Sequence, residues 1–455
     1  MKAERPPAAA SGIVERWRLL RGLKADYTGT MQQLHARHGD AVYMRLGPVR
    51  SYCFAHPELV REVLVEKGAS FIRWRRAMEV FSRAHGQSVL ITEGTPWQRQ
   101  RRMLQPVFAP KRFEAYAQQM AATGAAGLDA LVIAPDGRLD FEQAMTRLTM
   151  DVILRTMFGS HAPADAAAVG DAVRVLGHAA MREMFLPFAV PQWVPLPWRR
   201  ASRRALARLD ALIGGVIAQR RARPHEPAGP DDLLAMLMAA TDEEGDGAGL
   251  ADHEVRDQCM TMFLAGHETT ASALTWWGWA MAAHPDVAAR AAAEVDAVLA
   301  GRPPGHADLA RLPWLGQTLK ETLRLWPPAA GLFTREAIED VRIGDWLLPA
   351  GALAVTTPYV MHRDPRWFPE PERFDPERFA PERAAQLPRG AYLPFGVGPR
   401  VCIGNNFALM EMVLLAALML QRFQFALPAG APPPRPSLNV SLRPAQRLEL
   451  VLRRR

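Results

Sequence analysis

Ten residues near the C-terminus constrain this chain most, because they place one cysteine among glycines, an arginine and a phenylalanine just before a long apolar segment. The segment 395–404 contains that cysteine, Cys402, and the apolar residues from 407 onward predict a buried helix. Backbone amides and the helix dipole favour the thiolate form of a cysteine at the start of a helix. The sequence therefore predicts a tight, glycine-rich turn that presents a sulfur anion.

Arg400 adds a positive charge beside the cysteine and can bind an acidic group. Haem needs an iron ligand, a counter-charge for its propionates and close backbone approach to a flat ring, and the segment offers all three. A lone cysteine is often a buried core residue, so Cys402 taken alone leaves both interpretations open. The pattern of the whole segment favours a haem ligand.

The segment resembles the cysteine loop of the cytochrome P-450 family of haem-thiolate monooxygenases. The matching residues are Phe395, Gly398, Arg400, Cys402 and Gly404. The resemblance implies that Cys402 is the axial ligand of haem b, that Phe395 packs beside the sulfur, and that Arg400 faces a propionate. It also places Gly396 and Gly404 in the haem-binding turn. A thiolate ligand donates electron density to iron and favours cleavage of the O–O bond.

The family implies a mainly α fold with small β-sheets, a triangular prism with haem between a long oxygen-binding helix and the cysteine-ligand helix. We expect one domain over 1–455, because no linker or internal repeat divides the chain. Strand patterns predict a hairpin over 40–55 and a second β-rich segment over 333–360. Turn residues predict loops in the two remaining segments, 241–247 and 365–399.

A helix of unusual length is predicted from Asp252, as its N-cap, to about His284. Its apolar sequence is interrupted at 265–270, where glycine and threonine both disfavour helix. A helix opened locally at this point has room for water or dioxygen. The alternative is that the threonines bond back to helix carbonyls and that Glu268 is solvated.

This interruption resembles the oxygen-activating motif of the same family. The resemblance implies that Thr269 hydrogen-bonds dioxygen or a nearby water, that Glu268 relays protons, and that Ala265 and Gly266 leave space above the porphyrin. A zinc-protease motif needs a second histidine at position 271, which is alanine here.

Two further patterns resemble family signatures. Glu321 and Arg324 lie three residues apart on one helical face, and by resemblance they form a buried structural cluster with Arg378. Trp97 and Arg101 share a helix face and resemble the residues that contact a propionate. Arg335 resembles another propionate contact, and a solvated arginine is the alternative for both basic residues.

Composition limits the other functions. The chain has 455 residues, 49% of them hydrophobic, and a net charge of +8, but no aromatic-interleaved basic module indicates nucleic acid. Three widely separated cysteines indicate no disulfide framework. Residues 1–40 contain no signal or anchor segment, and we therefore expect a soluble, cytoplasmic protein. It resembles the bacterial members of the family, and we expect it to be a monomer.

The implied reaction is monooxygenation of a hydrophobic small molecule, a fatty acid or a terpenoid, by dioxygen. No nucleotide-binding or flavin module is seen in the sequence, so electrons are expected from NAD(P)H through a separate ferredoxin or flavoprotein. Arg99, Arg101, Arg102 and Arg400 are candidates for an acidic carrier's docking face. A haem-thiolate peroxygenase or isomerase, or a non-enzymatic haem protein, remains the alternative.

By the same resemblance, substrate contacts come from 71–89, from 185–198, from the oxygen helix and from 329–331. These segments are mostly apolar, which indicates a hydrophobic ligand. The segment 185–198 is interpreted as a lid over the substrate, with docking on a membrane as the alternative.

Overall fold

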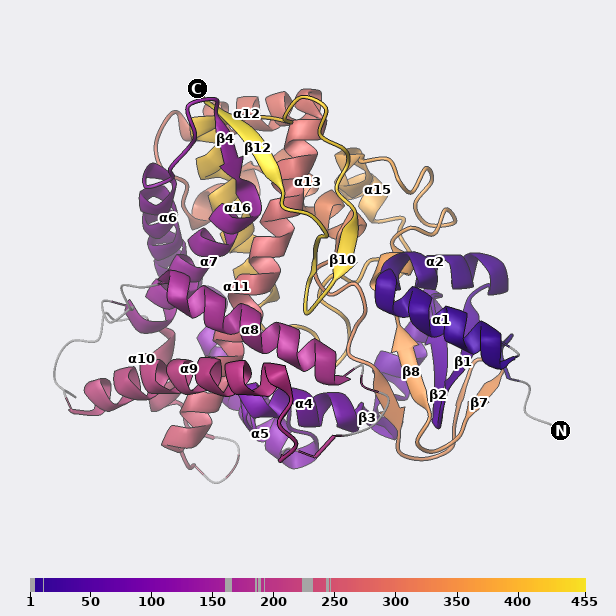
Figure 1. Ribbon diagram of the computed structural model, residues 1–455. Helices are drawn as coiled ribbons and strands as arrows, with labels where there is room; N and C mark the ends of the chain where they lie inside the picture. The colour runs from indigo at the N-terminus through magenta and orange to yellow at the C-terminus, as the bar shows by residue number, and fades with distance from the viewer. Residues whose placement is uncertain are drawn as a thin grey trace. The chain divides into compact units, whose positions relative to one another are not determined.

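The computed structural model is mainly helical, with four small β-sheets among the residues described (Figure 1). It describes residues 5–10, 12–159, 166–184, 186, 190–191, 193–222, 232–242, 245 and 247–455. Within that part of the chain, no helix is both long and apolar enough to cross a membrane. The predicted α+β class with predominant helix is confirmed.

Contacts divide the chain into two compact units, and each is described separately. The first contains residues 1–78, 317–403 and 433–446, and the second contains 79–316, 404–432 and 447–455. The expectation of a single domain therefore stays a prediction.

The first unit is built on a five-stranded sheet. Its strand order is β1-β2-β8-β5-β3, with β2 and β8 parallel and the other neighbours antiparallel. The strands are β1 (Ala41–Leu46), β2 (Val49–Phe54), β3 (Phe71–Arg73), β5 (Arg335–Ala337) and β8 (Leu353–Thr356). Leu46 pairs with Val49 across the turn, which confirms the predicted hairpin.

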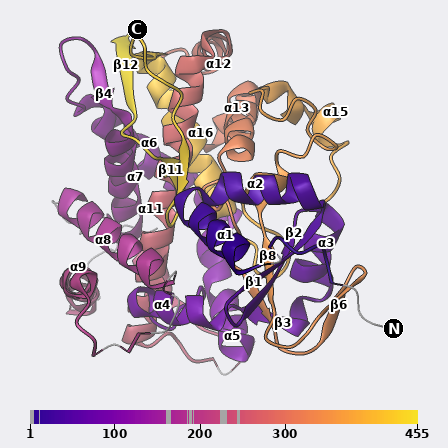
Figure 2. The same ribbon diagram turned by 45° about the vertical axis from the view of Figure 1, so that its right-hand side comes forward.

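Smaller elements complete this unit. They are α1 (Ile13–Ala25), α2 (Tyr27–His38), α3 (Pro57–Arg61), β6 (Val341–Ile343), β7 (Trp346–Leu348), α14 (Pro358–Met361), α15 (Pro381–Ala384), β10 (Pro436–Leu438) and β11 (Leu442–Pro444). Strands β5 to β8 confirm the second predicted β-rich segment. Helices α1 and α2 pack against β1 in both views (Figure 1, Figure 2), and they cover a core that includes Met31, Val42 and Phe54, all fully buried.

The second unit contains most of the long helices. They are α5 (Gly94–Leu104), α6 (Phe113–Asp129), α7 (Phe141–Phe158), α8 (Ala166–Met184), α9 (Pro197–Ala222), α10 (Leu233–Ala239), α11 (Asp252–Ala283), α12 (Pro285–Leu299) and α16 (Asn405–Arg422). Helices α4 (Arg75–His85) and α13 (Pro313–Leu325) contain two of the points at which the chain passes from one unit to the other. A three-stranded antiparallel sheet joins β4 (Arg138–Asp140), β12 (Glu449–Arg454) and β9 (Phe423–Ala426).

Helix α11 packs against α7, α9 and α16 (Figure 1). The predicted long helix is confirmed, but its start is corrected. Ala251 is the N-cap, and its N–H donates to Glu254 Oε2 over 3.0 Å, so Asp252 is the first helical residue and not the cap. Glu254 satisfies the amide because its longer side chain reaches back one turn.

Candidate functional site

The cysteine loop belongs to the first unit and has the tight turn that the sequence predicts. The Cys402 N–H donates to the Phe395 carbonyl over 3.0 Å, and Val401 N–H donates to the Gly398 carbonyl over 3.0 Å. Gly398 has φ +81°, and a Cβ there would lie 2.5 Å from the Leu64 carbonyl oxygen. Only glycine fits this position, both for its backbone angle and for the close approach of another chain segment.

The other two glycines of the loop differ in whether their backbone conformation requires glycine. Gly396 has φ +73°, which again favours glycine. Gly404 is the N-cap of α16 with φ −94°, and a Cβ there would make only an ordinary 3.7 Å contact with Phe108. The backbone conformation of Gly404 is therefore open to other residues, and its part in the haem-binding turn stays a prediction.

Exposure separates Cys402 from the other two cysteines. Cys402 is exposed, whereas Cys53 and Cys259 are fully buried. Burial raises the pKa of Cys53 and of Cys259 to about 12, so both remain thiols at neutral pH. Cys402 alone of the three is placed to bind a metal through its sulfur.

The polar residues that interrupt the apolar sequence of α11 lie in continuous helix. Residues 265–270 are all helical, and Thr269 Oγ1 donates to the Ala265 carbonyl over 2.8 Å. The local opening predicted from the sequence is therefore absent here, because the threonine hydroxyl bonds back within an intact helix. Ala265 is exposed and Gly266 and Thr269 are half-buried, although most of their neighbours along α11 are buried.

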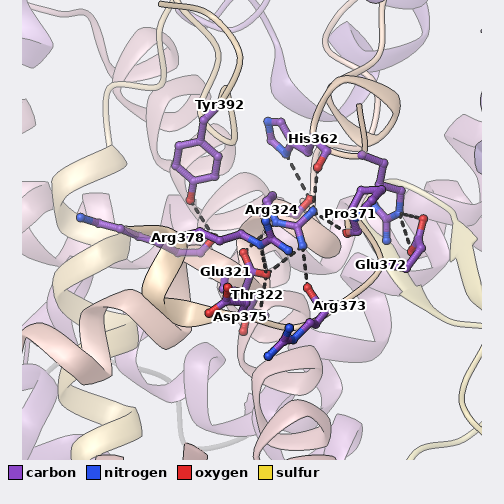
Figure 3. Close-up of polar contacts among 12 residues, drawn as sticks. Glu321, Thr322, Arg324, His362, Pro371, Glu372, Arg373, Asp375, Arg378 and Tyr392 are labelled. Atoms are coloured by element: carbon purple, nitrogen blue, oxygen red, sulfur yellow. Dashed lines mark hydrogen bonds and ion pairs between the residues drawn. The ribbon is translucent and has the colours of Figure 1, made fainter. Parts of the chain in front are cut away.

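Glu321 and Arg324 form the buried pair that the sequence predicts (Figure 3). Arg324 Nε and Nη2 donate to the two carboxylate oxygens over 2.7 and 2.8 Å, and both side chains are fully buried. Arg378 Nε lies 3.4 Å from Glu321 Oε1 as an ion pair, which confirms that these three residues lie together. Burial raises the pKa of Glu321, and the hydrogen bonds from Arg324 oppose that rise.

Arg324 also holds the chain that leads to the cysteine loop. Its Nη1 donates to the carbonyls of His362 and Pro371, each over 2.8 Å, and its Nη2 donates to the Arg373 carbonyl over 3.1 Å (Figure 3). The Asp375 N–H donates to Glu321 Oε1 over 2.9 Å. One buried arginine therefore organises the segment from 362 to 375.

His362 is a residue of this cluster that the sequence analysis missed. It is fully buried, its Nδ1 lies 3.2 Å from the Arg324 carbonyl oxygen, and its Nε2 accepts from the Leu393 N–H over 2.8 Å. These bonds require a neutral ring with the proton on Nδ1. Burial and the charge of Arg324 lower the pKa of His362 to about 3. Gly396 N–H in turn donates to the Leu393 carbonyl, so the bonds reach the cysteine loop.

The residues assigned to haem propionates lie in both units. Trp97 and Arg101 are half-buried, four residues apart on α5, as predicted. Arg335 begins β5, and its Nη1 donates to the Phe333 carbonyl over 2.6 Å. Arg400 is half-buried in the cysteine loop.

Two arginines proposed for an electron carrier are paired within the chain. Arg99 Nη1 donates to Glu254 over 2.9 Å, and Arg102 donates to both carboxylate oxygens of Asp242 over 3.1 Å. Their charges are therefore offset locally, and the predicted basic face is weaker than the sequence indicates. These bonds tie α5 to the segment that precedes α11 and to its first turn.

Glu411 is a second buried acid that the sequence analysis missed. It interrupts the apolar sequence of α16 and contacts Thr270 of α11. Burial raises the pKa of Glu411 to about 8, and the hydrogen bond with Thr270 opposes only part of that rise. Its carboxyl group is therefore mostly protonated at neutral pH.

The segment 185–198, interpreted as a lid, is described only in part, since 185, 187–189 and 192 lie outside the described residues. Arg199 is buried in α9 and donates to the carbonyls of Val190 and Val194 over 2.8 and 3.0 Å. It also donates to the buried Glu183 of α8 over 2.8 Å. The segment is thus tied to α8 and α9 by one buried arginine.

Comparison with known proteins gives the class. The family model described as Cytochrome P450 matches residues 15–452. The chain therefore belongs to the cytochrome P450 family and is an oxidoreductase of the monooxygenase class. The crystal structure of the cytochrome P450DA heme domain superposes with a TM-score of 0.88 at 26% identity, covering 100% of this chain and 98% of that one.

Three bacterial relatives are similar over most of their length. Cyclooctatin synthase of Streptomyces melanosporofaciens is 37% identical over 90% of this chain and 88% of its own. Pentalenene oxygenase of Streptomyces avermitilis is 32% identical over 92% of this chain and 90% of its own. A third, cyclooctat-9-en-7-ol 5-monooxygenase of S. melanosporofaciens, is 36% identical over 85% and 83%.

The family implies haem and dioxygen, and the chemistry of the residues described here fits haem. Cys402 supplies an exposed sulfur on a glycine turn, while Cys53 and Cys259 are buried. Ala265 is exposed on α11, and Arg101 and Arg400 carry the positive charge that propionates require. Nothing in this donor set conflicts with a thiolate-bound macrocycle.

Proposed function

We propose that this enzyme oxygenates a terpenoid. The observation that carries it is the similarity to cyclooctatin synthase, to cyclooctat-9-en-7-ol 5-monooxygenase and to pentalenene oxygenase, whose names refer to terpenoids. The mostly apolar segments assigned to substrate contact agree with a hydrophobic ligand.

In this proposal Cys402 would hold the haem iron through its thiolate, and Phe395, Gly396 and Gly404 would form the haem-binding turn around it. Arg400, Trp97, Arg101 and Arg335 would bind the propionates. Haem supplies the activation of dioxygen for transfer of one oxygen atom. The Cys402 N–H bond to Phe395 fixes the cysteine backbone, so the sulfur is held before any ligand binds.

On the oxygen side we assign Thr269 to hold a proton and Glu268 to move it from solvent. Thr269 Oγ1 now donates to the Ala265 carbonyl, and it must give up or share that bond to donate elsewhere. Ala265 and Gly266 place no large side chain on the same helix face, so a small molecule can reach the Thr269 hydroxyl.

We further propose that the whole chain, 1–455, acts as one haem domain, as a monomer in the cytoplasm. Its electrons come from NAD(P)H through a ferredoxin or a flavoprotein. The docking face for this carrier would include Arg101 and Arg400, while the charges of Arg99 and Arg102 are offset by partners within the chain.

The terpenoid proposal is tested by titrating the ferric protein with a panel of terpenes and fatty acids. We expect terpenes to convert the haem from low to high spin at lower concentration than fatty acids of equal carbon number. Turnover with hydrogen peroxide alone at the rate seen with a reductase would favour a peroxygenase. No spin change with any hydrophobic compound would favour a non-enzymatic haem protein.

Thr269→Ala is expected to separate reductant consumption from product formation. The variant loses the hydroxyl that donates from α11, so we expect consumption to continue while product falls about tenfold and peroxide accumulates. Product per reductant consumed is the quantity to measure. Thr269→Ser keeps a hydroxyl and serves as the matched control, and unchanged coupling in Thr269→Ala contradicts the role assigned to Thr269.

A further inference from the structure

A polar cluster in the second unit contains none of the residues that are assigned to haem binding or to proton transfer. It joins α11 to the end of α4 and to the loop that follows α4. Val89 N–H donates to Gln258 Oε1 over 3.1 Å, Thr261 Oγ1 donates to Ser88 Oγ over 2.6 Å, and His85 Nδ1 lies 3.1 Å from Thr261 Oγ1. All of these residues except Val89 are buried.

The loop is held rigidly in this position. Gly86 has φ +58°, and a Cβ there would lie 2.0 Å from the carboxylate of Asp257, so the turn requires glycine. Gln87 N–H donates to Asp257 Oδ2 over 2.7 Å, and the Gln87 carbonyl accepts from Gln100 Nε2 over 2.8 Å. The cluster is therefore organised before any ligand binds.

One donor of this cluster has no protein acceptor. Gln258 is fully buried, and its Nε2 finds no hydrogen-bond partner within the described part of the chain. Its amide orientation is fixed, because exchanging nitrogen and oxygen would turn an N–H toward the Val89 N–H. A buried amide donor without an acceptor costs free energy, so a water or a ligand oxygen is expected to accept from it.

Helix geometry places Gln258 on the face of α11 that carries the proposed chemistry. Residues at steps of four, three and four lie on one side of an α-helix, and Gln258, Met262, Ala265 and Thr269 follow these steps. Met262 and Thr269 are half-buried and Ala265 is exposed. Along the helix axis Gln258 lies about 10 Å from Ala265 and about 16 Å from Thr269.

The charge around Gln258 selects the kind of oxygen that it can bind. Burial, then Arg256, lowers the pKa of His85 to about 4, so the ring is neutral at physiological pH. Arg256 donates to Asp257 over 2.7 Å and to Asp210 over 2.9 Å, which offsets its charge. Neither His85 nor Arg256 therefore offers an unpaired positive charge to a carboxylate, and a neutral oxygen is the better partner for the amide.

We propose that Gln258 donates a hydrogen bond to a hydroxyl or carbonyl oxygen of an otherwise hydrophobic substrate and so determines which end faces Thr269. This inference rests on the proposed function and narrows it. The substrate is a terpenoid that already carries one neutral oxygen, not a fatty acid, and the attacked carbon lies about 10 to 16 Å from that oxygen, along α11. The preceding reaction is then an oxygenation or hydration of the hydrocarbon.

Two hydrocarbon and oxygenated pairs long enough to span this distance, abietadiene with abietadienol and neophytadiene with phytol, test this on the ferric holoenzyme. Affinities are measured by spin-state titration and by calorimetry, with palmitic acid included. We expect the oxygenated member to bind about tenfold more tightly. Gln258→Met should remove that preference and leave hydrocarbon affinity and haem content unchanged, while Gln118→Met, at an exposed position of α6, should change neither.

The outcomes separate this inference from the proposed function. Equal affinity within both pairs, or a preference that survives in Gln258→Met, means that Gln258 bonds water only and overturns the inference while the terpenoid proposal stands. Failure of all four terpenes to bind overturns both. The affinity ratio of the unmodified protein needs no substitution, so the inference can be tested even if Gln258→Met fails to fold.

Discussion

Cys402→Ala is expected to lose all monooxygenase activity and the long-wavelength absorption of reduced, carbon-monoxide-bound haem-thiolate protein. The reason is that only a thiolate ligand gives this spectrum and the associated electron donation. Cys402 alone of the three cysteines is exposed at a turn, so neither of the other two thiols can replace it. The measurement is the absorption spectrum of the dithionite-reduced protein with and without carbon monoxide.

The matched controls are Cys53→Ala and Cys259→Ala. Both thiols are buried and remain protonated at neutral pH, so their removal should preserve the spectrum and cost only packing energy. A long-wavelength band that persists in Cys402→Ala contradicts the assignment. So does a spectrum of nitrogen-ligated haem in the unmodified protein.

Arg324→Ala is expected to destabilise the first unit by about 3 to 5 kcal/mol, because it leaves the Glu321 carboxylate buried without its partner. It also removes the donors that hold the carbonyls of His362, Pro371 and Arg373. We expect little soluble holoprotein and a strongly lowered midpoint of thermal unfolding, measured together with haem content per chain.

Arg373→Ala is the control for this experiment. The Arg373 side chain is exposed and pairs only with the exposed Glu370 among the ion pairs described, while its backbone carbonyl, which Arg324 binds, is unchanged. Such a surface pair contributes about 0 to 1 kcal/mol. If Arg324→Ala unfolds at the same temperature as the control and retains its haem, the organising role of Arg324 is wrong.

The sequence predicts the glycine turn, the buried ion pair and the β-hairpin because a local pattern determines each of them. The turn at Gly398 needs glycine because of its own backbone angle, and the pair Glu321 and Arg324 lies one turn apart on α13. The hairpin over 40–55 follows from strand residues on both sides of Gly47. In each case neighbours in the sequence are also neighbours in space.

Prediction failed where the partner lies far away in the chain. Arg99 and Arg102 were counted as surface charge because their partners, Glu254 and Asp242, are about 150 residues distant. Gln258 carries no signal in the sequence, since its importance arises only from the Gly86 turn that brings Val89 to it. The ion pairs of these arginines and the burial of Gln258 depend on distant segments of the chain, so no local sequence pattern predicts them.

His362 connects the Arg324 cluster to the cysteine loop only while it is uncharged. Its pKa is about 3 in the folded chain and near 6.5 when unfolded, so its contribution to stability is complete above pH 6.5 and declines as acid protonates the unfolded chain first. Across physiological pH the ring therefore has one protonation state in the folded protein. The hydrogen bonds by which His362 joins Arg324 to Leu393 therefore keep the same protonation throughout that pH range.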